Sequence, residues 1–252
     1  MTLRSVVCFF AHPDDESVLA GGISAMLTRC GIPVHIVCCT RGEGGEAGEP
    51  PVVQQREQLG QAREAELLCA AQALGASVQV LDYVDPLIGP DDVLSAFEHD
   101  SDTLALEFLE IARRKRADLI LTHGRDGEYG HPAHRAVNFA VMRAFPRMMP
   151  ETLIYTVAAL VPDIEDRLWN QSEPAHYALD IRPWGDAKLG AMECHASQHA
   201  LFMRRKKLEA VRDALRTVES VRRQHPPVRE PEPPEDAFAS LLRAVGAWTP
   251  RQ

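Results

Sequence analysis

The first residues that could do chemistry are a histidine and three acids near the start of the chain. The apolar run Ser5–Ala11 continues directly into His12-Pro13-Asp14-Asp15-Glu16. Burying such groups at the end of a strand is unfavourable unless they pair or bind a cation. His12 and Asp15 are three residues apart across a proline-containing turn, so both can converge on one point. An imidazole and a carboxylate are suitable zinc ligands, although this spacing alone occurs often by chance.

A second group of histidines follows another apolar run. Asp118–Thr122 leads into His123 and a glycine-containing loop that carries His131 and His134 just before a predicted helix. If the ends of these two runs are neighbours in a sheet, His12, Asp15 and one histidine of the loop form a set of two histidines and one carboxylate. Three protein ligands with a fourth position left for water is the composition of a catalytic zinc site.

Asp14 has no place in this ligand set and is therefore a candidate for acid–base chemistry. A carboxylate beside a metal site can take a proton from water and return it to a leaving amine. A second histidine that does not bind the metal would stabilise the developing oxyanion. His131 and Tyr129 are the candidates for that role.

The elements that must position these residues alternate between two patterns over the first 157 residues. Short apolar runs are typical of buried parallel strands, and the stretches between them have helical spacing. The predicted strands are Ser5–Ala11, Pro33–Thr40, Val78–Leu81, Asp118–Thr122 and Leu153–Val157, and the predicted helices are Ser17–Cys30, Gln54–Leu74, Asp102–Arg116 and a helix from His134 to about Arg143. This alternation predicts an α/β fold with a Rossmann-like, doubly wound, mainly parallel sheet and helices on both faces. In such sheets, sites gather beyond the carboxyl ends of the strands.

The last hundred residues have a weaker pattern. We expect a long helix over Leu201–Arg223 that carries the basic cluster 204–207, which we interpret as a solvated helix face. The Pro-rich segment His225–Glu235 reads as a linker or surface strap, and a short helix over Glu235–Trp248 follows. The expected organisation is one catalytic domain over residues 1–225, with a Pro-rich linker and a C-terminal helix over 226–252 packing on it.

Composition limits the classes of function and partner. The 252 residues carry a net charge of -9, which argues against the sequence-independent phosphate binding of nucleic-acid proteins. No apolar run approaches the length of a membrane span and no cleavable leader is evident, so we expect a cytoplasmic, soluble protein without a membrane or nucleic-acid partner. The six cysteines are scattered without a CxxC pair, and we expect all of them to be reduced. The sequence is compatible with a homo-oligomer.

The two motifs together, AHPDDE after the first strand and HPAHR about 120 residues later, resemble those of the PIG-L/LmbE-like zinc N-deacetylases. The resemblance spans about residues 6–198. It implies that His12, Asp15 and His134 bind the metal, that Asp14 is the general base, and that His131 polarises the carbonyl with help from Tyr129.

The same resemblance suggests substrate-binding residues. Glu43 in a T-R-G-E loop, Arg63 in an R-x-x-E helix, Asp85, and His195 in an H-A-S-Q segment preceded by Lys188 correspond to positions near the family's sugar site. One position departs from the family: Ala133 stands where an acid usually tunes the neighbouring histidine. This departure predicts a lower pKa and a weaker electrostatic role for His131.

These observations predict a metal-dependent amidohydrolase that removes an acyl group, acetyl first of all, from an amino-sugar conjugate of the N-acetylglucosaminyl type. The cofactor is Zn²⁺, with Fe²⁺ or another divalent ion as alternatives. An amidase acting on a non-sugar amide and a non-catalytic metal-dependent carbohydrate-binding module are the competing hypotheses, and Asp14 argues against the latter. The exact substrate is not specified by the sequence.

Three of these features also have a simpler interpretation. The H-P-D-D-E segment could be a surface turn in which Asp14 caps the next helix. Arg63 could form an i, i+3 ion pair with Glu66 instead of contacting substrate. Gly42-Glu43-Gly44-Gly45-Glu46-Ala47 matches a dinucleotide-binding pattern, but its acids would repel a pyrophosphate and Pro50-Pro51 prevent an immediate helix.

Overall fold

A computed structural model describes residues 3–204, 207–229 and 232–250 of the chain. The chain divides into two compact units. The first comprises residues 1–9, 99–180 and 218–252, and the second comprises residues 10–98 and 181–217.

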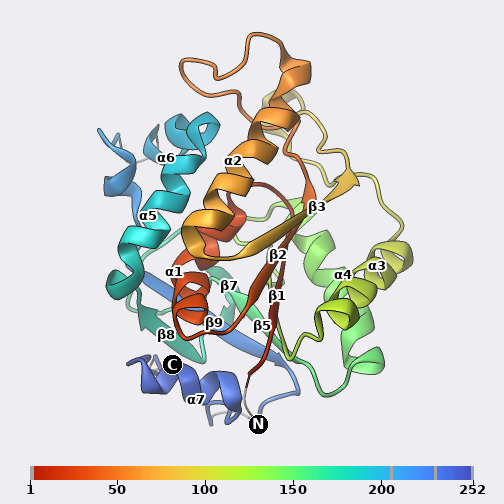
Figure 1. Ribbon diagram of the computed structural model, residues 1–252, viewed down its shortest axis with the longest axis vertical. Coiled ribbons are helices and arrows are strands. Elements are labelled where there is room, and N and C mark those ends of the chain that lie inside the picture. The colour runs from red at the N-terminus through yellow and green to blue at the C-terminus, as the bar shows by residue number, and fades with distance from the viewer. Residues whose placement is uncertain (1–2, 205–206, 230–231, 251–252) are drawn as a thin grey trace. The chain divides into compact units, whose positions relative to one another are not determined.

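The first unit is built around parallel strands. β1 (Val6–Phe10) pairs in parallel with β4 (Leu119–Thr122), which pairs in parallel with β5 (Leu153–Val157). Helices α3 (Ser101–Lys115) and α4 (Pro132–Met148) lie side by side (Figure 1). Phe9 of β1 stacks on Phe108 of α3 with ring centroids 4.2 Å apart, and Phe145 of α4 closes this core edge-on. The apolar strands predicted from the sequence are therefore central strands of a buried core.

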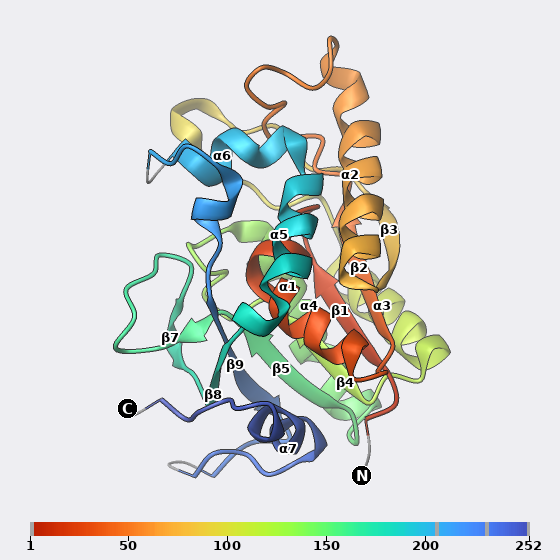
Figure 2. The same ribbon diagram turned by 60° about the vertical axis from the view of Figure 1, so that its left-hand side comes forward.

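Two antiparallel strands extend the same unit. β9 (Val218–His225) pairs antiparallel with β5 on one side and with β8 (Tyr177–Asp180) on the other, as Figure 2 shows. A short pair, β6 (Ala159–Leu160) and β7 (Asn170–Pro174), forms a separate ribbon. Helix α7 (Ala237–Ala244) belongs to this unit, and its N-cap residue Asp236 accepts a 2.6 Å hydrogen bond from the buried Tyr155 hydroxyl.

The second unit joins two strands to three packed helices. β2 (Val34–Thr40) and β3 (Ser77–Tyr83) are parallel, and α1 (Asp15–Arg29), α2 (Leu59–Leu74) and α5 (Gly185–Cys194) pack on one another. A short helix, α6 (His199–Arg204), and single 3-10 turns at 56–58, 90–92, 182–184, 196–198 and 211–214 complete the unit. Gly75 ends α2 in the left-handed conformation that favours glycine at such ends.

The strand order of the main sheet is β3-β2-β1-β4-β5-β9-β8, so the mainly parallel α/β fold predicted from the sequence is confirmed. Strands β1 and β4 are neighbours, with Phe9 opposite Thr122, so the condition on which the predicted metal site depends is met for these strands. Among the described residues, no helix is long and apolar enough to cross a membrane.

Two expectations are wrong. The region predicted as one helix over Leu201–Arg223 contains α6, a 3-10 turn and strand β9, because pairing with both β5 and β8 outweighs local helix propensity. Cys69 and Cys194 are not reduced but form a disulfide that joins α2 to the end of α5.

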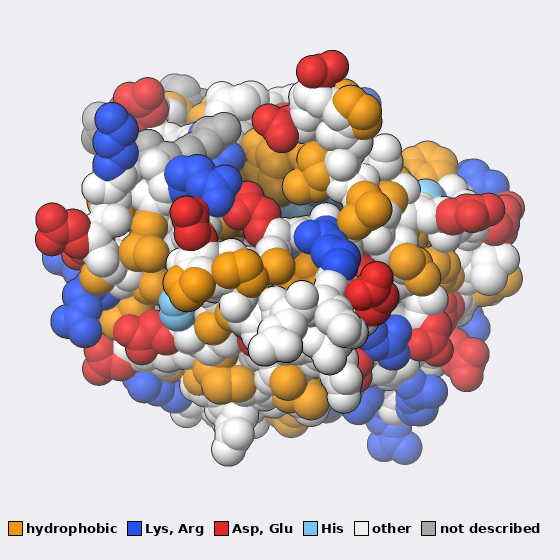
Figure 3. Space-filling model, turned by 90° about the horizontal axis from the view of Figure 1, so that it is seen from above, with side chains coloured by type: hydrophobic (Ala, Val, Ile, Leu, Met, Phe, Trp, Pro, Cys, Tyr) orange, Lys and Arg blue, Asp and Glu red, His pale blue; other side chains and the backbone are white. Residues whose placement is uncertain are grey.

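The surface is mixed in charge. On the face in Figure 3, acidic, basic and apolar side chains are interspersed. Within the basic cluster 204–207, Arg204 pairs with both carboxylate oxygens of Glu46 at 2.9 and 2.6 Å, whereas Arg205 and Lys206 lie outside the described residues.

Candidate metal centre

The turn that leaves β1 places His12 between two carboxylates. Strand β1 ends at Phe10 and α1 begins at Asp15, so residues 11–14 form a tight connection. The Oδ2 of Asp15 accepts a 2.9 Å hydrogen bond from the backbone N–H of His12 and lies 3.5 Å from its Nδ1. The Oδ1 of Asp85, which follows β3, lies 3.2 Å from the Nε2 of the same imidazole. His12 and Asp15 are both buried.

This environment favours positive charge at His12. Burial lowers the pKa of His12, but the hydrogen bonds and charges of Asp15 and Asp85 outweigh burial and raise it to about 10. A buried imidazole that faces two carboxylates is a place where a cation is stabilised, and a divalent ion competes with the proton for the same ligand atoms.

Asp14 occupies a strained position in this turn. Its φ of 115° and ψ of -27° lie outside the regions that non-glycine residues normally adopt, and its side chain makes no capping hydrogen bond to α1. The structure therefore contradicts the interpretation of Asp14 as a side-chain cap of α1. Burial raises the pKa of Asp14 to about 7, the nearby Asp15 and Glu16 acting in the same direction and Arg63 and His195 in the opposite one.

Arg63 of α2 is buried beneath this turn and bonds to backbone. Its Nη2 donates to the carbonyl of Pro13 at 2.5 Å and its Nη1 to the carbonyl of Gly42 at 2.9 Å, and Nη2 lies 3.6 Å from Oδ2 of Asp14. The Arg63–Glu66 pair considered from the sequence is not among these contacts. Glu66 instead accepts from the backbone N–H and the hydroxyl of Ser197 at 2.8 and 2.6 Å.

The glycines of the 42–47 loop make room for protein atoms. A Cβ at Gly42 or Gly45 would lie 2.3 or 2.2 Å from Nη1 of Arg63, and one at Gly44 would lie 1.9 Å from the carbonyl oxygen of Pro86. The glycine spacing that matches a dinucleotide pattern is thus explained by the packing of Arg63 and the 85–86 segment.

Glu43 and Glu16 each bond to a residue from a distant part of the same unit. The Oε2 of Glu43 accepts from the backbone N–H of Asp85 at 3.2 Å. Glu16 is fully buried, and its Oε1 lies 2.7 Å from Nε2 of His195. Burial lowers the pKa of His195, but the charge and hydrogen bond of Glu16 outweigh it, so this pKa is raised. Lys188, also predicted near the site, is buried and donates to the carbonyl of Val18 at 3.0 Å.

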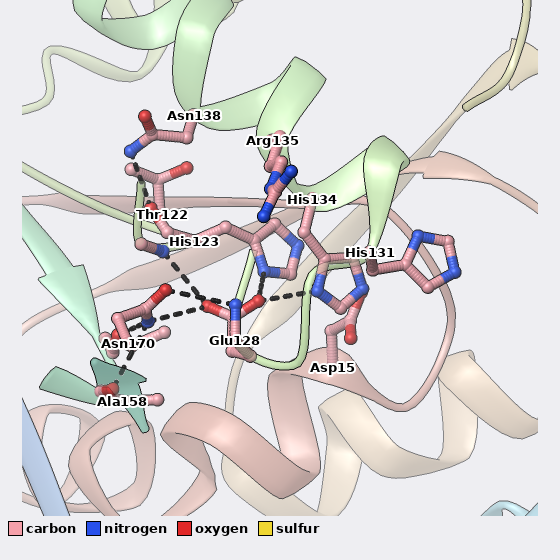
Figure 4. Close-up of polar contacts among 12 residues, drawn as sticks. Asp15, Thr122, His123, Glu128, His131, His134, Arg135, Asn138, Ala158 and Asn170 are labelled. Carbon is pink, nitrogen blue, oxygen red and sulfur yellow. Dashed lines mark hydrogen bonds and ion pairs between the residues drawn. The ribbon is translucent and has the colours of Figure 1, made fainter. Parts of the chain in front are cut away.

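In the first unit, the loop after β4 is organised around the buried Glu128 (Figure 4). Its Oε2 lies 2.5 Å from Nδ1 of His134 and 3.1 Å from Nδ1 of His123. Its Oε1 accepts from the backbone N–H of Gly124 at 3.0 Å and from the side chain of Asn170 at 3.2 Å. Burial raises the pKa of Glu128, but the charges and hydrogen bonds of His123 and His134 lower it well below its usual range.

An ionised Glu128 fixes the tautomer of both histidines. Because the carboxylate can only accept, Nδ1 of His134 and of His123 must each carry a hydrogen. The neutral ring of His134 then has its lone pair on Nε2. Metal-binding histidines almost always donate their other ring N–H to a carboxylate, a backbone carbonyl or water, and the Nδ1–H of His134 is held in the first of these ways.

His131 and Tyr129 flank His134. The imidazole planes of His131 and His134 are stacked with centroids 4.6 Å apart, and the Tyr129 ring meets His131 and His134 edge-on at 5.7 Å. His131 precedes α4, and its Nδ1 accepts a 3.2 Å hydrogen bond from the backbone N–H of Ala133. Position 133 therefore acts on His131 through its backbone, and a neutral His131 carries its hydrogen on Nε2.

Each unit thus brings some of the predicted site residues together. The second unit holds His12, Asp15, Asp14, Arg63, Glu43 and Asp85 around one turn, with His195 on Glu16, and the first holds His134, His131 and Tyr129. The sequence interpretation missed Glu128, His123, Asn170 and Glu16. The third acid of the H-P-D-D-E run was a signal for Glu16, whereas nothing in a glycine-rich loop marks Glu128 as buried.

Both loops carry buried side chains of the kinds that bind zinc. His12, Asp15, His123, His131 and His134 are all buried, and each belongs to a group of side chains that could hold a metal ion. These buried histidines and Asp15 are candidate metal ligands.

The chain is similar to several known proteins. Over 222 residues the chain is 31% identical to a 1D-myo-inositol 2-acetamido-2-deoxy-alpha-D-glucopyranoside deacetylase from Corynebacterium diphtheriae, covering 76% of this chain and 75% of the relative. The zinc-inhibited form of the teicoplanin deacetylase Orf2 has a similar fold, with a TM-score of 0.64, 14% identity and coverage of 89% of this chain and 100% of the other.

A third similar protein is a hydratase. GalB, the 4-carboxy-2-hydroxymuconate hydratase from Pseudomonas putida KT2440, matches with a TM-score of 0.62, 22% identity and coverage of 90% and 99%. The fold is therefore shared by enzymes of more than one reaction type. The family model described as PIG-L, GlcNAc-PI de-N-acetylase, matches residues 7–145, more than half of the sequence. The chain belongs to the PIG-L family.

Proposed function

We propose that this chain is a divalent-metal-dependent N-deacetylase that hydrolyses the acetamide of an N-acetylglucosaminyl conjugate. The observation that carries the proposal is the 2.5 Å contact between Glu128 and Nδ1 of His134, because it presents the opposite nitrogen of a buried imidazole as a ligand.

The proposed ligands are His12, Asp15 and His134. Phe9 of β1 lies opposite Thr122 of β4 in a parallel pair, so the chain leaves both strands at the same end. His12 follows Phe9 by three positions and His123 follows Thr122 directly. The proposal requires the loops that follow β1 and β4 to meet around one ion.

The residues fit a zinc ion by the chemistry of their donors. Two imidazoles and one carboxylate are the ligands of many catalytic zinc sites, and Glu128 supplies the carboxylate that holds a ligand histidine from behind. When bound, the ion would supply Lewis-acid chemistry, polarising the amide carbonyl and making water reactive at neutral pH. We propose Zn²⁺, with Fe²⁺ or another divalent ion as the alternative.

Asp14 is the proposed general base and acid. Its carboxylate would take a proton from the attacking water and deliver it to the nitrogen of the leaving amine, so that one amide and one water give acetate and an amine. Its side chain is partly exposed beside the buried Arg63 and makes no helix-capping hydrogen bond, which leaves it available for this role.

His131 and Tyr129 are proposed to stabilise the negative charge that develops on the carbonyl oxygen. The backbone N–H of Ala133 bonds to Nδ1 of His131, so the Nε2–H of the neutral ring is the group that donates. Tyr129 is about half exposed, and its ring meets those of His131 and His134 edge-on, which places it beside the histidine proposed to stabilise this charge.

Glu43 and Asp85 are the proposed contacts for sugar hydroxyls. Both are half-buried carboxylates near His12, and a carboxylate accepts hydrogen bonds from vicinal hydroxyls. The acidic 43–49 loop disfavours a strongly anionic substrate. The deacetylase from Corynebacterium diphtheriae, which is named for an acetamido-glucopyranoside of inositol, supports an uncharged amino-sugar conjugate as the substrate class.

The test is acetate release from a panel of N-acetylglucosamine conjugates that differ in the aglycone. We expect activity that a chelator abolishes and added zinc restores, with about one metal ion per chain. A metal-loaded protein that releases no acetate from any conjugate or from simple acetamides would reject the proposal. In that case, water addition to unsaturated carboxylates is the reaction to assay next, because the fold is shared with a hydratase.

A further inference from the structure

The backbone at Asp14 is strained and must be held in place by its surroundings. Asp14 has a φ of 115°, a value that few residues other than glycine adopt. Such a conformation persists only where the surrounding structure over-determines it, and it is concentrated at functional sites. The direction of the Asp14 carboxylate depends on this φ, since the side chain leaves from the same Cα.

The peptide group before Asp14 is fixed at both of its polar atoms. The carbonyl oxygen of Pro13 accepts a 2.5 Å hydrogen bond from Nη2 of Arg63. The N–H of Asp14 donates to Oε2 of Glu16 at 3.0 Å. Rotation about the N–Cα bond of Asp14 would turn this peptide plane and break at least one of these bonds, so Arg63 and Glu16 together set φ.

Glu16 is itself held by His195. Both side chains are completely buried, and Oε1 of Glu16 lies 2.7 Å from Nε2 of His195 and 2.6 Å from the Ser17 hydroxyl. A buried carboxylate requires such partners. The two oxygens of Glu16 therefore have separate tasks: Oε2 holds the N–H of Asp14, and Oε1 is anchored by His195 and Ser17.

The segment that carries His195 is fastened to α2, the helix that carries Arg63. The disulfide Cys69–Cys194 joins α2 to the residue before His195. Glu66 of α2 accepts two hydrogen bonds from Ser197, two residues after His195. Helix α2 thus supplies one clamp on the Asp14 peptide directly through Arg63 and supports the other through His195.

We propose that Arg63 and the Glu16–His195 pair are positioning residues. They fix the Pro13–Asp14 peptide, keep the backbone of Asp14 in its left-handed conformation, and so set the direction of the Asp14 carboxylate. This assigns Arg63 and His195 a role other than substrate contact. The inference rests on the proposed function for its kinetic test, and the conformation of Asp14 supplies a test that is independent of activity.

The kinetic test compares Glu16→Ala, His195→Ala and Arg63→Ala with the wild type for kcat, KM and bound metal. Misdirection of Asp14 lowers kcat at least about tenfold, while KM stays within about twofold and metal content is unchanged. His195→Gln keeps an N–H that can reach Glu16, so it should recover much of the kcat lost in His195→Ala. Gln72→Ala, on an exposed position of α2, is the matched control.

Two results would overturn the proposal. Wild-type kcat in Glu16→Ala and Arg63→Ala would show that the clamp is unnecessary, and a rise in KM alone would return Arg63 and His195 to substrate binding. Where an alanine variant fails to fold, Glu16→Gln and Arg63→Lys are measured under the same criteria.

A crystal structure of Glu16→Ala or Glu16→Gln gives the independent readout. We expect the φ of Asp14 to move toward negative values. Unchanged φ in the variant would overturn the positioning role, whether or not the protein releases acetate. If the wild type is inactive on every conjugate while φ moves as expected, the proposed function fails and the positioning role stands.

Discussion

The carboxylate of Glu128 lies 2.5 Å from Nδ1 of His134, on the side of the ring opposite the nitrogen proposed to bind metal. Glu128→Gln keeps the shape but removes the charge that fixes the tautomer. Loss of such a partner typically weakens metal affinity about 10- to 100-fold. We expect a drop in this range when zinc affinity is measured by competition with a chelating dye. Glu110→Gln, exposed on α3, is the control, and equal affinity in the two variants would exclude the orienting role of Glu128.

Asp14→Asn should separate metal binding from chemistry. The amide is similar in size but cannot accept a proton, so we expect full metal content with a loss of at least about 100-fold in kcat, the lower end of general acid–base contributions. Metal analysis and acetate release are measured on the same preparation. Turnover close to wild type with metal bound would assign the proton transfer to another group.

His134→Ala should lose metal, because it removes one of three proposed ligands and leaves Glu128 without its closest partner. The check is metal content after gel filtration against a weak chelator. His225→Ala, at the end of β9, is the control histidine. Full occupancy in His134→Ala would move the third ligand to another residue of the loop, His123 or His131 first.

The central part of the fold could be predicted from the sequence because its signals are local. The strands from β1 to β5 are short apolar runs, and most predicted boundaries lie within one or two residues of those found. Strand β9 was missed for the opposite reason. Its segment, Val218–His225, has only two apolar residues, three positions apart as in a helix, and it follows a run rich in helix formers. Only long-range pairing with β5 and β8 makes it a strand.

The same distinction between local signals and long-range contacts applies to the candidate site. The motifs single out His12, Asp14, Asp15 and His134, which are the side chains that the proposed chemistry uses. The groups that orient them are set by tertiary structure: Glu128 lies in a loop held by Asn170 from β7, and Glu16 meets a histidine 179 positions away. A sequence pattern contains no information about such a distant partner.

The pair of Arg4 with Asp118 should make stability depend on pH. Arg4 donates to Asp118 from its side chain at 3.1 and 2.6 Å and from its backbone at 2.8 Å, and these bonds lower the pKa of Asp118 in the folded protein. A carboxyl with a lowered folded-state pKa contributes stability above its unfolded pKa of about 3.9, and this contribution is lost as the pH falls.

We therefore expect Asp118→Asn to be less stable than wild type at pH 7, with the difference shrinking as the pH approaches 3. Urea unfolding of both proteins across this range is the measurement. Arg4 is largely exposed, so the effect is smaller in high salt. A difference in unfolding free energy that stays constant with pH would show that the charge of Asp118 does not contribute.

The disulfide between Cys69 and Cys194 predicts a redox-dependent stability. It closes a loop across 125 positions, and such a cross-link stabilises mainly by restricting the unfolded chain, by about 2–4 kcal/mol. Cys69 is exposed and Cys194 half-buried, so a reductant has access to the bond. We expect Cys69→Ser/Cys194→Ser, or reductant on the wild type, to lower the free energy of unfolding by this amount. The control is Cys30→Ser, which replaces an exposed free cysteine and should change the free energy of unfolding little.

Thiol titration of the unreduced, denatured wild type should count the four free cysteines, Cys8, Cys30, Cys38 and Cys39. Six titratable thiols, together with a denaturation midpoint that reductant does not move, would show that the bond does not form in solution.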